Sequence, residues 1–309
     1  MSRPMRGRVR LPRKKEDLSA AFIFGLGCGP CPRWGDRPMI LAIAGDLHGA
    51  LDALYDRLRT WEARSGRRIV LVLQSGDLGA FTNASILDRS TRKRMEKDPL
   101  ELGAAPYLEG VKTAPWETWF VRGNHEDFRL LGESPDGFLD PARRIRLLQG
   151  GRIHTAPGGL RIAALGGIQP RQVREPGLPK YVQDAEAAAL LGQEAGCTDI
   201  LLTHDGPIGR SLQGVPSAGS IAVYNLLKRL RPRWHFFGHY DRPLPPFDLF
   251  GCRSVCMNQP GPARIPGRDG SVAILDAAEH RFAWIDADGS ERALLADGAL
   301  PPAGPGGTP

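Results

Sequence analysis

Cysteine is scarce in this sequence, and long apolar runs are missing from it. The 309 residues include 5 cysteines, an odd number with no regular spacing, which argues against the disulfide framework of a small secreted protein. No apolar run reaches the roughly 20 residues that a membrane-spanning helix needs. The stretch at 18–28 is a weak match to a secretion signal, because Glu16 and Asp17 stand directly before it. We therefore expect a cytoplasmic protein with no membrane contact.

Excess positive charge is concentrated at one end of the chain. The formal net charge is +7, but residues 1–18 hold seven basic and two acidic residues, a net +5, so the other 291 residues carry only +2. The charge balance of the main part therefore does not by itself indicate a nucleic-acid partner, and nothing in it indicates a protein partner. Residues 1–38 are rich in Arg, Gly and Pro, which favours a disordered or loosely attached basic extension.

The rest of the chain has the composition of a soluble globular protein, with 41% hydrophobic and 24% charged residues. Apolar runs predict strands at 40–44, 69–75, 117–123, 199–203 and 234–237, and helical spacing predicts helices at 50–64 and 220–230. Short strands expected between 145 and 165 mark the crossing into a second sheet. We expect one α/β domain over 39–290, with two facing sheets, and a Pro/Gly-rich tail at 291–309.

Five of the predicted strands end in residues that can bind a metal ion. The candidate ligands after these strands are Asp46, His48, Asp77, Asn124, His204, His239 and Asp241. Any one of them alone is better explained as a helix cap or an ordinary loop residue. In open α/β sheets, however, ligands bind outside the carboxyl ends of the strands. Oxygen donors mixed with imidazoles suit Mn²⁺, Fe or Zn²⁺, and two such ions sharing a carboxylate could clamp a phosphate and generate a hydroxide nucleophile.

Together these motifs resemble those of the calcineurin-like metallophosphoesterase superfamily. The matching blocks are Gly45-Asp46-Leu47-His48-Gly49, Gly76-Asp77, Gly123-Asn124-His125-Glu126, Thr203-His204 and Gly238-His239, in the family's order over about 39–261. The resemblance implies an αββα sandwich, in which two facing mixed β-sheets are flanked by helices. It also implies a hydrolase of phosphoric esters that uses two divalent metal ions, with Mn²⁺ expected first and Fe or Zn²⁺ as alternatives.

The resemblance further implies a role for each residue. One cation would be held by Asp46, His48 and Asp77. The other would be held by Asp77, Asn124, His204 and His239, so that Asp77 bridges the two. His125 would contact the scissile phosphate and protonate the leaving group, which makes His125, Asn124 and Asp77 the expected catalytic residues.

The last block departs from the family pattern. A second histidine usually stands two residues after the first, where this chain has Asp241. Asp241 either binds the first cation, which would favour harder ions such as Mn²⁺, or pairs with Arg242 or a water and leaves that cation weakly held.

Three features are together similar to those of RNA lariat debranching enzymes, which act on 2′–5′ phosphodiesters. They are Gly76-Asp77-Leu78-x-Ala80-x-x-Asn83, Thr203-His204-Asp205-Gly206-Pro207 and the Gly-rich loop before Ser220. Eukaryotic members commonly have cysteine at the position of Asp46 and keep the final histidine, so the similarity implies a relative rather than the same substrate. We expect a phosphodiesterase acting on a nucleotide or a nucleic acid such as RNA. A phosphomonoesterase of a small substrate and a binding scaffold with weakened catalysis remain as alternatives.

Two local features have two interpretations each. The charge run of Arg89, Arg92, Lys93 and Arg94 either contacts substrate phosphate or forms a solvated helix face. Glu126 and Asp127 either orient His125 or cap the helix that follows.

Overall fold

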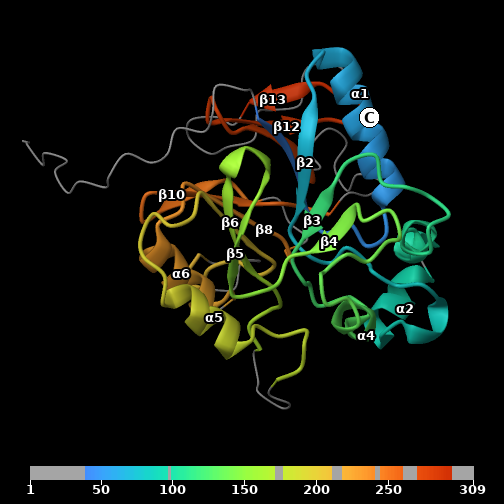
Figure 1. The fold of residues 1–309 in the computed structure, drawn as a ribbon, viewed down its shortest axis with the longest axis horizontal. Helices are drawn as coiled ribbons and strands as arrows, with labels where there is room; N and C mark the ends of the chain where they lie inside the picture. Colours follow the sequence, from blue (N-terminus) through green and yellow to red (C-terminus); the bar gives the residue numbers. More distant parts are fainter. Residues whose placement is uncertain are drawn as a thin grey trace, which may run out of the picture. The chain divides into compact units, whose positions relative to one another are not determined.

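The computed structural model describes residues 39–96, 99–170, 177–210, 218–240, 244–259 and 270–293. In this part of the chain two β-sheets face each other, and helices cover their outer faces (Figure 1). The expected fold of two facing mixed sheets flanked by helices is therefore confirmed. The expectations for residues 1–38, for Asp241 and for the tail beyond residue 293 fall outside the described residues.

The first sheet has seven strands among the described residues, in the order β13-β12-β11-β1-β2-β3-β4. They are β1 (Ile40–Ala44), β2 (Ile69–Gln74), β3 (Thr118–Phe120), β4 (Ile145–Leu147), β11 (Val272–Asp276), β12 (Arg281–Ile285) and β13 (Glu291–Ala293). Strands β1 to β4 run parallel, and β11 to β13 add antiparallel strands beyond β1. β3 is shorter than the expected 117–123, and β13 extends the sheet three residues past the boundary expected at 290.

The second sheet has six strands in the described part of the chain, in the order β5-β6-β7-β8-β10-β9. They are β5 (Arg152–Thr155), β6 (Arg161–Leu165), β7 (Ile200–Thr203), β8 (Trp234–Phe237), β9 (Phe247–Leu249) and β10 (Cys252–Cys256). The four inner strands run parallel, whereas β5 and β9 pair antiparallel at the two ends. Strands buried on both faces read as continuous apolar runs, as β7 and β8 do.

The helices follow from apolar spacing and end residues. In α1 (Leu51–Ser65) the buried residues recur every three or four positions, and Gly66 ends the helix with a φ of 69°. The other helices are α2 (Arg89–Met95), α3 (Ala105–Leu108), α4 (Phe128–Gly132), α5 (Asp184–Leu191) and α6 (Ile221–Leu230), with 3₁₀ turns η1 (Ala84–Ile86), η2 (Pro99–Leu102) and η3 (Pro157–Gly159). Among the described residues, none of these helices has the length and apolar character needed to span a membrane.

Three layers of apolar side chains hold the sheets and helices together. Leu41 and Leu73 of the first sheet pack against Leu202 and Phe236 of the second, which forms the layer between the sheets. The outer face of the first sheet is covered by α1, and that of the second by α5 and α6 (Figure 1). Because both faces of each sheet are covered, polar groups concentrate where the strands end.

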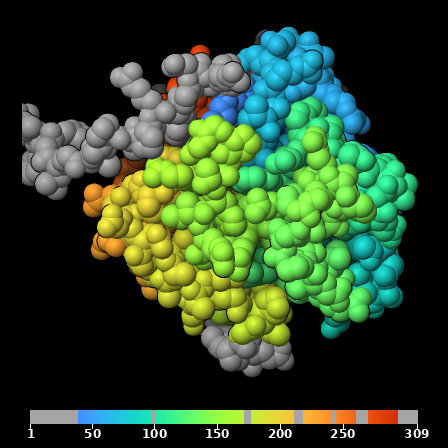
Figure 2. Space-filling view, in the orientation of Figure 1, coloured from blue at the N-terminus to red at the C-terminus, as the bar shows by residue number. Residues whose placement is uncertain are grey.

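The loops at the carboxyl ends of the parallel strands lie next to the connection between β2 and β3. Both views place α2, in that connection, beside α4 (Figures 1 and 2). His125, which lies shortly before α4, contacts Asp88, the residue that caps α2. This connection therefore packs against the edge of the sheets that carries the candidate ligands.

Candidate metal centre

Three of the candidate ligands have a left-handed backbone, which is uncommon for residues other than glycine. His48, Asp77 and His239 have φ values of 45°, 54° and 68°, and each lies in the loop after a strand. A residue in this conformation costs about 1–3 kcal/mol, and such strain is concentrated at functional sites in folded proteins. The loops thus direct these three side chains to fixed positions.

The structure brings Asp46, Asp77 and His204 into one buried group. One ligand atom from each lies within 4.8 Å of the others. Nε2 of His204 is 3.5 Å from Oδ2 of Asp77, and Nδ1 of His204 is 3.8 Å from Oδ1 of Asp46. All three side chains are buried, so water screens the electrostatic interactions among them only weakly. Two carboxylates from one sheet and an imidazole from the other are therefore close enough together to bind one cation.

The hydrogen bonds of His204 show that the group fits a cation. Nδ1 lies 2.9 Å from the carbonyl oxygen of Ser75, which can only accept, so Nδ1 carries the proton. Nε2 then presents a lone pair to Oδ1 of Asn124 at 3.0 Å and to Oδ2 of Asp77. Three acceptor atoms face one another without a proton between them. A positive ion would satisfy all three, and neutral imidazole with oxygen donors is a ligand set for divalent metals.

Asp77 lies between His48 and His204. Its Oδ1 accepts hydrogen bonds from the backbone N–H groups of Asn124 and His125, at 2.7 and 2.8 Å. Its Oδ2 is turned toward the imidazoles and lies 3.7 Å from Nε2 of His48. Burial raises the pKa of Asp77, but the charges of His204 and His48 lower it by more than burial raises it. The pKa of Asp77 therefore lies well below its usual range. The carboxylate is thus ionised and central.

Asp46 and His239 are joined through the backbone. The N–H of His239 donates to both oxygens of the Asp46 carboxylate, at 3.1 and 2.9 Å. The ring of His239 lies next to that of His204, with 5.2 Å between centroids. Burial lowers the pKa of His204 to about 4, so that imidazole is neutral near pH 7, as a metal ligand must be. Six of the seven expected ligands therefore gather in one place, and the seventh, Asp241, is outside the described residues.

His125 lies beside this group and faces its own carboxylate. Its ring centroid is 5.6 Å from that of His48, and its Nδ1 is 3.0 Å from Oδ2 of Asp88. Burial would lower the pKa of His125, but the hydrogen bond to Asp88 and the charge of Asp77 outweigh it and raise that pKa. Asp88 was not marked by the motifs. Its local sequence shows a helix cap, since Ser90 and Thr91 follow it, but not its contact with His125.

Two buried side chains support the ligand loops in ways that the sequence did not reveal. The side-chain amide of Gln74, at the end of β2, donates to the carbonyls of both Gly45 and Gly76 and so ties together the loops of Asp46 and Asp77. Glu126 accepts hydrogen bonds from the N–H groups of Leu78 and Ala80, at 2.9 and 2.8 Å. Glu126 therefore holds the Asp77 loop, rather than orienting His125.

The helix cap expected in this region is the neighbouring residue. Asp127 caps α4 through its side chain, which accepts from the N–H groups of Arg129 and Leu130. Of the two interpretations of Glu126 and Asp127, capping therefore holds for Asp127.

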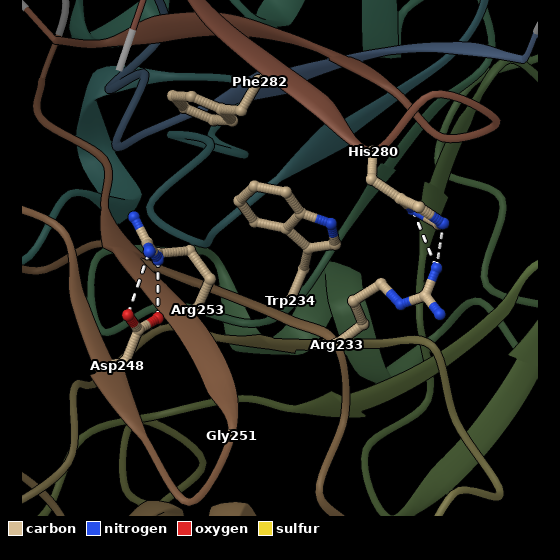
Figure 3. A pocket seen from close by; sticks show the side chains of 7 residues that line it. All are labelled: Arg233, Trp234, Asp248, Gly251, Arg253, His280 and Phe282. Carbon is tan, nitrogen blue, oxygen red and sulfur yellow. Dashed lines mark hydrogen bonds and ion pairs between the residues drawn. The ribbon is translucent and has the colours of Figure 1, made fainter. Parts of the chain in front are cut away.

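A separate cavity of about 450 Å³ lies at the other end of β8, with Trp234 and Phe282 among its walls (Figure 3). Its charged groups already have partners. Asp248 binds Nε and Nη2 of Arg253 at 2.6 and 2.9 Å, and Arg233 contacts His280. Trp234 begins β8, whereas His239 follows its end. The cavity is therefore remote from the group of acidic residues and histidines, which is the better candidate for a reaction centre.

Comparisons with known proteins agree with this geometry. The family model described as calcineurin-like phosphoesterase matches residues 39–243. CWF19-like protein 1 of Xenopus laevis is 27% identical over 212 residues, covering 65% of this chain and 36% of that protein. The lariat debranching enzyme of Arabidopsis thaliana is 27% identical over 231 residues, covering 65% of this chain and 54% of that protein. The chain thus matches between about one third and one half of the length of these relatives.

Among solved structures with the same fold is the following crystal structure. It superimposes with a TM-score of 0.53 at 14% sequence identity, over 80% of this chain and 98% of that chain. At this identity the similarity concerns the fold alone, and it agrees with the two facing sheets and the helices on their outer faces.

Proposed function

Because the chain belongs to the calcineurin-like phosphoesterase family, we propose that it hydrolyses phosphodiesters with the help of two divalent cations. The proposal is carried by one observation: the ligand atoms of the buried residues Asp46, Asp77 and His204 all lie within 4.8 Å of one another. The proposed substrate is a nucleotide or a nucleic acid.

The proposed ligands divide into two sets that share Asp77. One cation is assigned to Asp46, His48 and Asp77, and the other to Asp77, Asn124, His204 and His239. Bound there, the cations would stabilise the charge that develops on the phosphoryl oxygens and lower the pKa of water. Asp241, beyond the described residues, is assigned to the first set as a further oxygen ligand.

The donor atoms support manganese as the metal, with iron and zinc as alternatives. The assigned ligands are carboxylate or amide oxygens and imidazole nitrogens, and oxygen-rich sets of this kind suit Mn²⁺. The nearby thiol of Cys256 is not a candidate ligand. Burial is the main cause that raises the pKa of Cys256 well above its usual value, and the charges of Asp46 and Asp205 add to it. The thiol therefore stays protonated.

His125 is assigned the role of proton donor to the leaving oxygen. Its Nδ1 is engaged by Asp88 and by the hydroxyl of Thr91, each at 3.0 Å. The proton on Nε2 is then available to a leaving group beside the centre. The raised pKa of His125 keeps the ring protonated to higher pH than an ordinary histidine, which is what a general acid working near neutral pH requires.

The preference for diesters and nucleic acids is supported by similarity to relatives. Lariat debranching enzymes of Arabidopsis thaliana and Drosophila pseudoobscura pseudoobscura match this chain at 27% and 28% identity. The oligonucleotide set in the assay below therefore includes 2′–5′ as well as 3′–5′ linkages.

A panel of phosphoesters tests the proposal. Mn²⁺-loaded protein is assayed on bis-p-nitrophenyl phosphate, p-nitrophenyl phosphate, mononucleotides, and short 2′–5′ and 3′–5′ oligonucleotides, with Fe²⁺, Zn²⁺ and Mg²⁺ in parallel. Faster cleavage of diesters is expected, whereas faster cleavage of monoesters would favour the phosphomonoesterase alternative. Asp77→Asn should abolish hydrolysis, because it removes the negative charge that both cations share.

Elemental analysis separates the enzyme from a binding scaffold that has kept the fold. Two metal ions per chain are expected for the enzyme. A wild-type protein that binds no ion and cleaves no ester in the panel would contradict the proposed function.

A cytoplasmic location is proposed as well. Cys197, Cys252 and Cys256 are free thiols in the structure, as is usual for proteins of a reducing compartment. Fractionation of the source cells, with the protein followed by antibody, would test this.

A further inference from the structure

A buried carboxylate lies directly behind one of the proposed ligands. Glu101, in η2, is 1% exposed, and neither of its oxygens has a hydrogen-bond partner among the described residues. Its Oε2 is 3.5 Å from Nδ1 of His48. Nδ1 of His48 is also buried without a hydrogen bond in the described part of the chain. Two buried polar groups that lack hydrogen bonds thus face each other, and such groups are rare enough to require an explanation.

The two nitrogens of His48 face different surroundings. Nδ1 faces Glu101, and Nε2 faces Oδ2 of Asp77 at 3.7 Å. A histidine that binds metal is neutral, with a proton on one nitrogen and a lone pair on the other. Because a carboxylate accepts protons, Glu101 favours the tautomer with the proton on Nδ1. The lone pair of Nε2 then points toward Asp77, where a cation would sit.

Arg94 provides the charge that a buried carboxylate needs. Its Nε lies 3.2 Å from Oε1 of Glu101, and its Nη1 donates to Oε1 of Gln259 at 2.9 Å. The guanidinium is therefore held between η2 and the loop after β10. A buried carboxylate without a cation nearby would be costly. Arg94 was expected either to contact substrate phosphate or to lie on a solvated helix face. The structure instead pairs its side chain with a carboxylate of the protein.

We propose that Glu101 is a positioning residue that fixes the tautomer and the ring orientation of His48, with Arg94 balancing its charge. The proposal rests on the proposed function, because it concerns a ligand of one of the two cations. Metal-binding histidines often hydrogen-bond through their other ring nitrogen to a carboxylate. This contact orients the ring and makes the metal-binding nitrogen a stronger electron-pair donor. Glu101 lies in the part of the β2–β3 connection that comes after the Gly76-Asp77 block, and it belongs to none of the five family blocks.

Metal binding is the first readout. Glu101→Leu removes the acceptor, and Glu101→Gln keeps one oxygen but removes the charge. Mn²⁺ binding is measured by titration calorimetry and electron paramagnetic resonance. Two ions should bind to the wild type and to each variant. The Kd of one ion should rise by roughly 10–100-fold in E101L, and by less in E101Q. The Kd of the other ion should change little.

A matched control comes from the opposite end of the second sheet. Asp199 is also a buried carboxylate paired with an arginine, Arg161, at 2.8 Å, but it stands directly before β7, whereas His204 follows that strand. Asp199→Asn removes a buried charge without touching the centre, so its Mn²⁺ binding should equal that of the wild type. Circular dichroism of all variants reports folding, and E101Q carries the test if E101L does not fold.

The tautomer of His48 is the second readout, and a purely structural role would not change it. Nitrogen-15 NMR of the metal-free protein distinguishes a protonated Nδ1 from a protonated Nε2, and a His48→Gln variant identifies the His48 signals among the seven histidines. The wild type should carry the proton on Nδ1. E101L should shift the population toward Nε2, while the other histidines keep their signals.

The outcomes separate this inference from the function on which it rests. If the wild type binds two Mn²⁺ and E101L binds them equally well, the role of Glu101 is refuted and the proposed function stands. Weaker binding with an unchanged His48 tautomer would also refute the orienting role. A wild type that binds no cation would overturn both proposals.

Discussion

Replacing Gly238 by alanine should impair cation binding while leaving the fold intact. Gly238 follows β8, and its φ lies outside the left-handed region, so the backbone there accepts alanine. The added Cβ, however, would lie 2.0 Å from Oδ1 of Asp46 and 2.8 Å from Oγ of Ser75. The obstacle is thus the end of a proposed ligand, which can rotate away, and not the rigid backbone.

The size of the effect follows from these distances. Ordinary contact with a Cβ begins at 3.4 Å, so the Asp46 oxygen must retreat by about 1.4 Å. That movement breaks the hydrogen bonds from the N–H of His239, at a cost of about 1.5–3 kcal/mol for a charged acceptor. A domain with about 5–15 kcal/mol of stability survives this loss. A ligand oxygen that must lie about 2 Å from its metal does not tolerate such a displacement, and a shift of 1 Å in a reaction centre costs about 100-fold in rate.

Thermal unfolding with and without Mn²⁺ measures both effects. At a Mn²⁺ concentration of 100 times the wild-type Kd, a 100-fold rise in Kd lowers the Mn²⁺-dependent stabilisation from about 2.7 to about 0.4 kcal/mol. The matched control is Gly132→Ala at the end of α4, where an added Cβ meets nothing within 4 Å among the described residues. G132A should behave as the wild type. If G238A keeps both the Mn²⁺-dependent stabilisation and the diester activity of the wild type, the assignment of Asp46 as a ligand is wrong.

Other predictions concern the proton donor, the core and the metal. Asp88→Asn removes the negative charge that, together with its hydrogen bond, raises the pKa of His125, so protonated His125 is lost at lower pH and the alkaline limb of kcat/KM should move to lower pH. A pH–rate profile with an unmoved alkaline limb would contradict the role of His125 as acid. Tyr55→Phe removes a buried 2.9 Å hydrogen bond to Thr118 and should cost about 1 kcal/mol in urea unfolding, with Mn²⁺ binding unchanged. EDTA should stop diester cleavage and added Mn²⁺ should restore it; activity that persists in EDTA would exclude a metal requirement.

The position of the candidate centre could be predicted because it follows from strand order. Asp46, Asp77 and Asn124 each come after a parallel strand of the first sheet, and parallel strands end at the same edge. His204 and His239 follow neighbouring parallel strands of the second sheet. The meeting of the two sets depends on how the sheets face each other, which the family resemblance supplied and strand periodicity alone did not.

The supporting residues could not be predicted, because their partners are set by tertiary packing. Asp88 and Glu101 lie in a long polar connection whose apolar residues have no regular period, so nothing local shows that one meets His125 and the other His48. For a related reason, neither interpretation of Glu126, orienting His125 or capping a helix, gave its actual partners. Its side chain reaches 48 positions back along the chain, to the N–H of Leu78, rather than to the adjacent residue.

The proposed ligands come from both sheets, and this has a mechanical consequence. Asp77 and Asn124 belong to loops of the first sheet, and His204 belongs to a loop of the second. A cation bound by all three would therefore link the two sheets at the edge where these loops lie. Removing the cation should make this edge more mobile. Amide hydrogen exchange should then speed up more in the loop after β7 than at the start of β7, near Asp199. Metal content would then set the stiffness of the candidate metal centre as well as its reactivity.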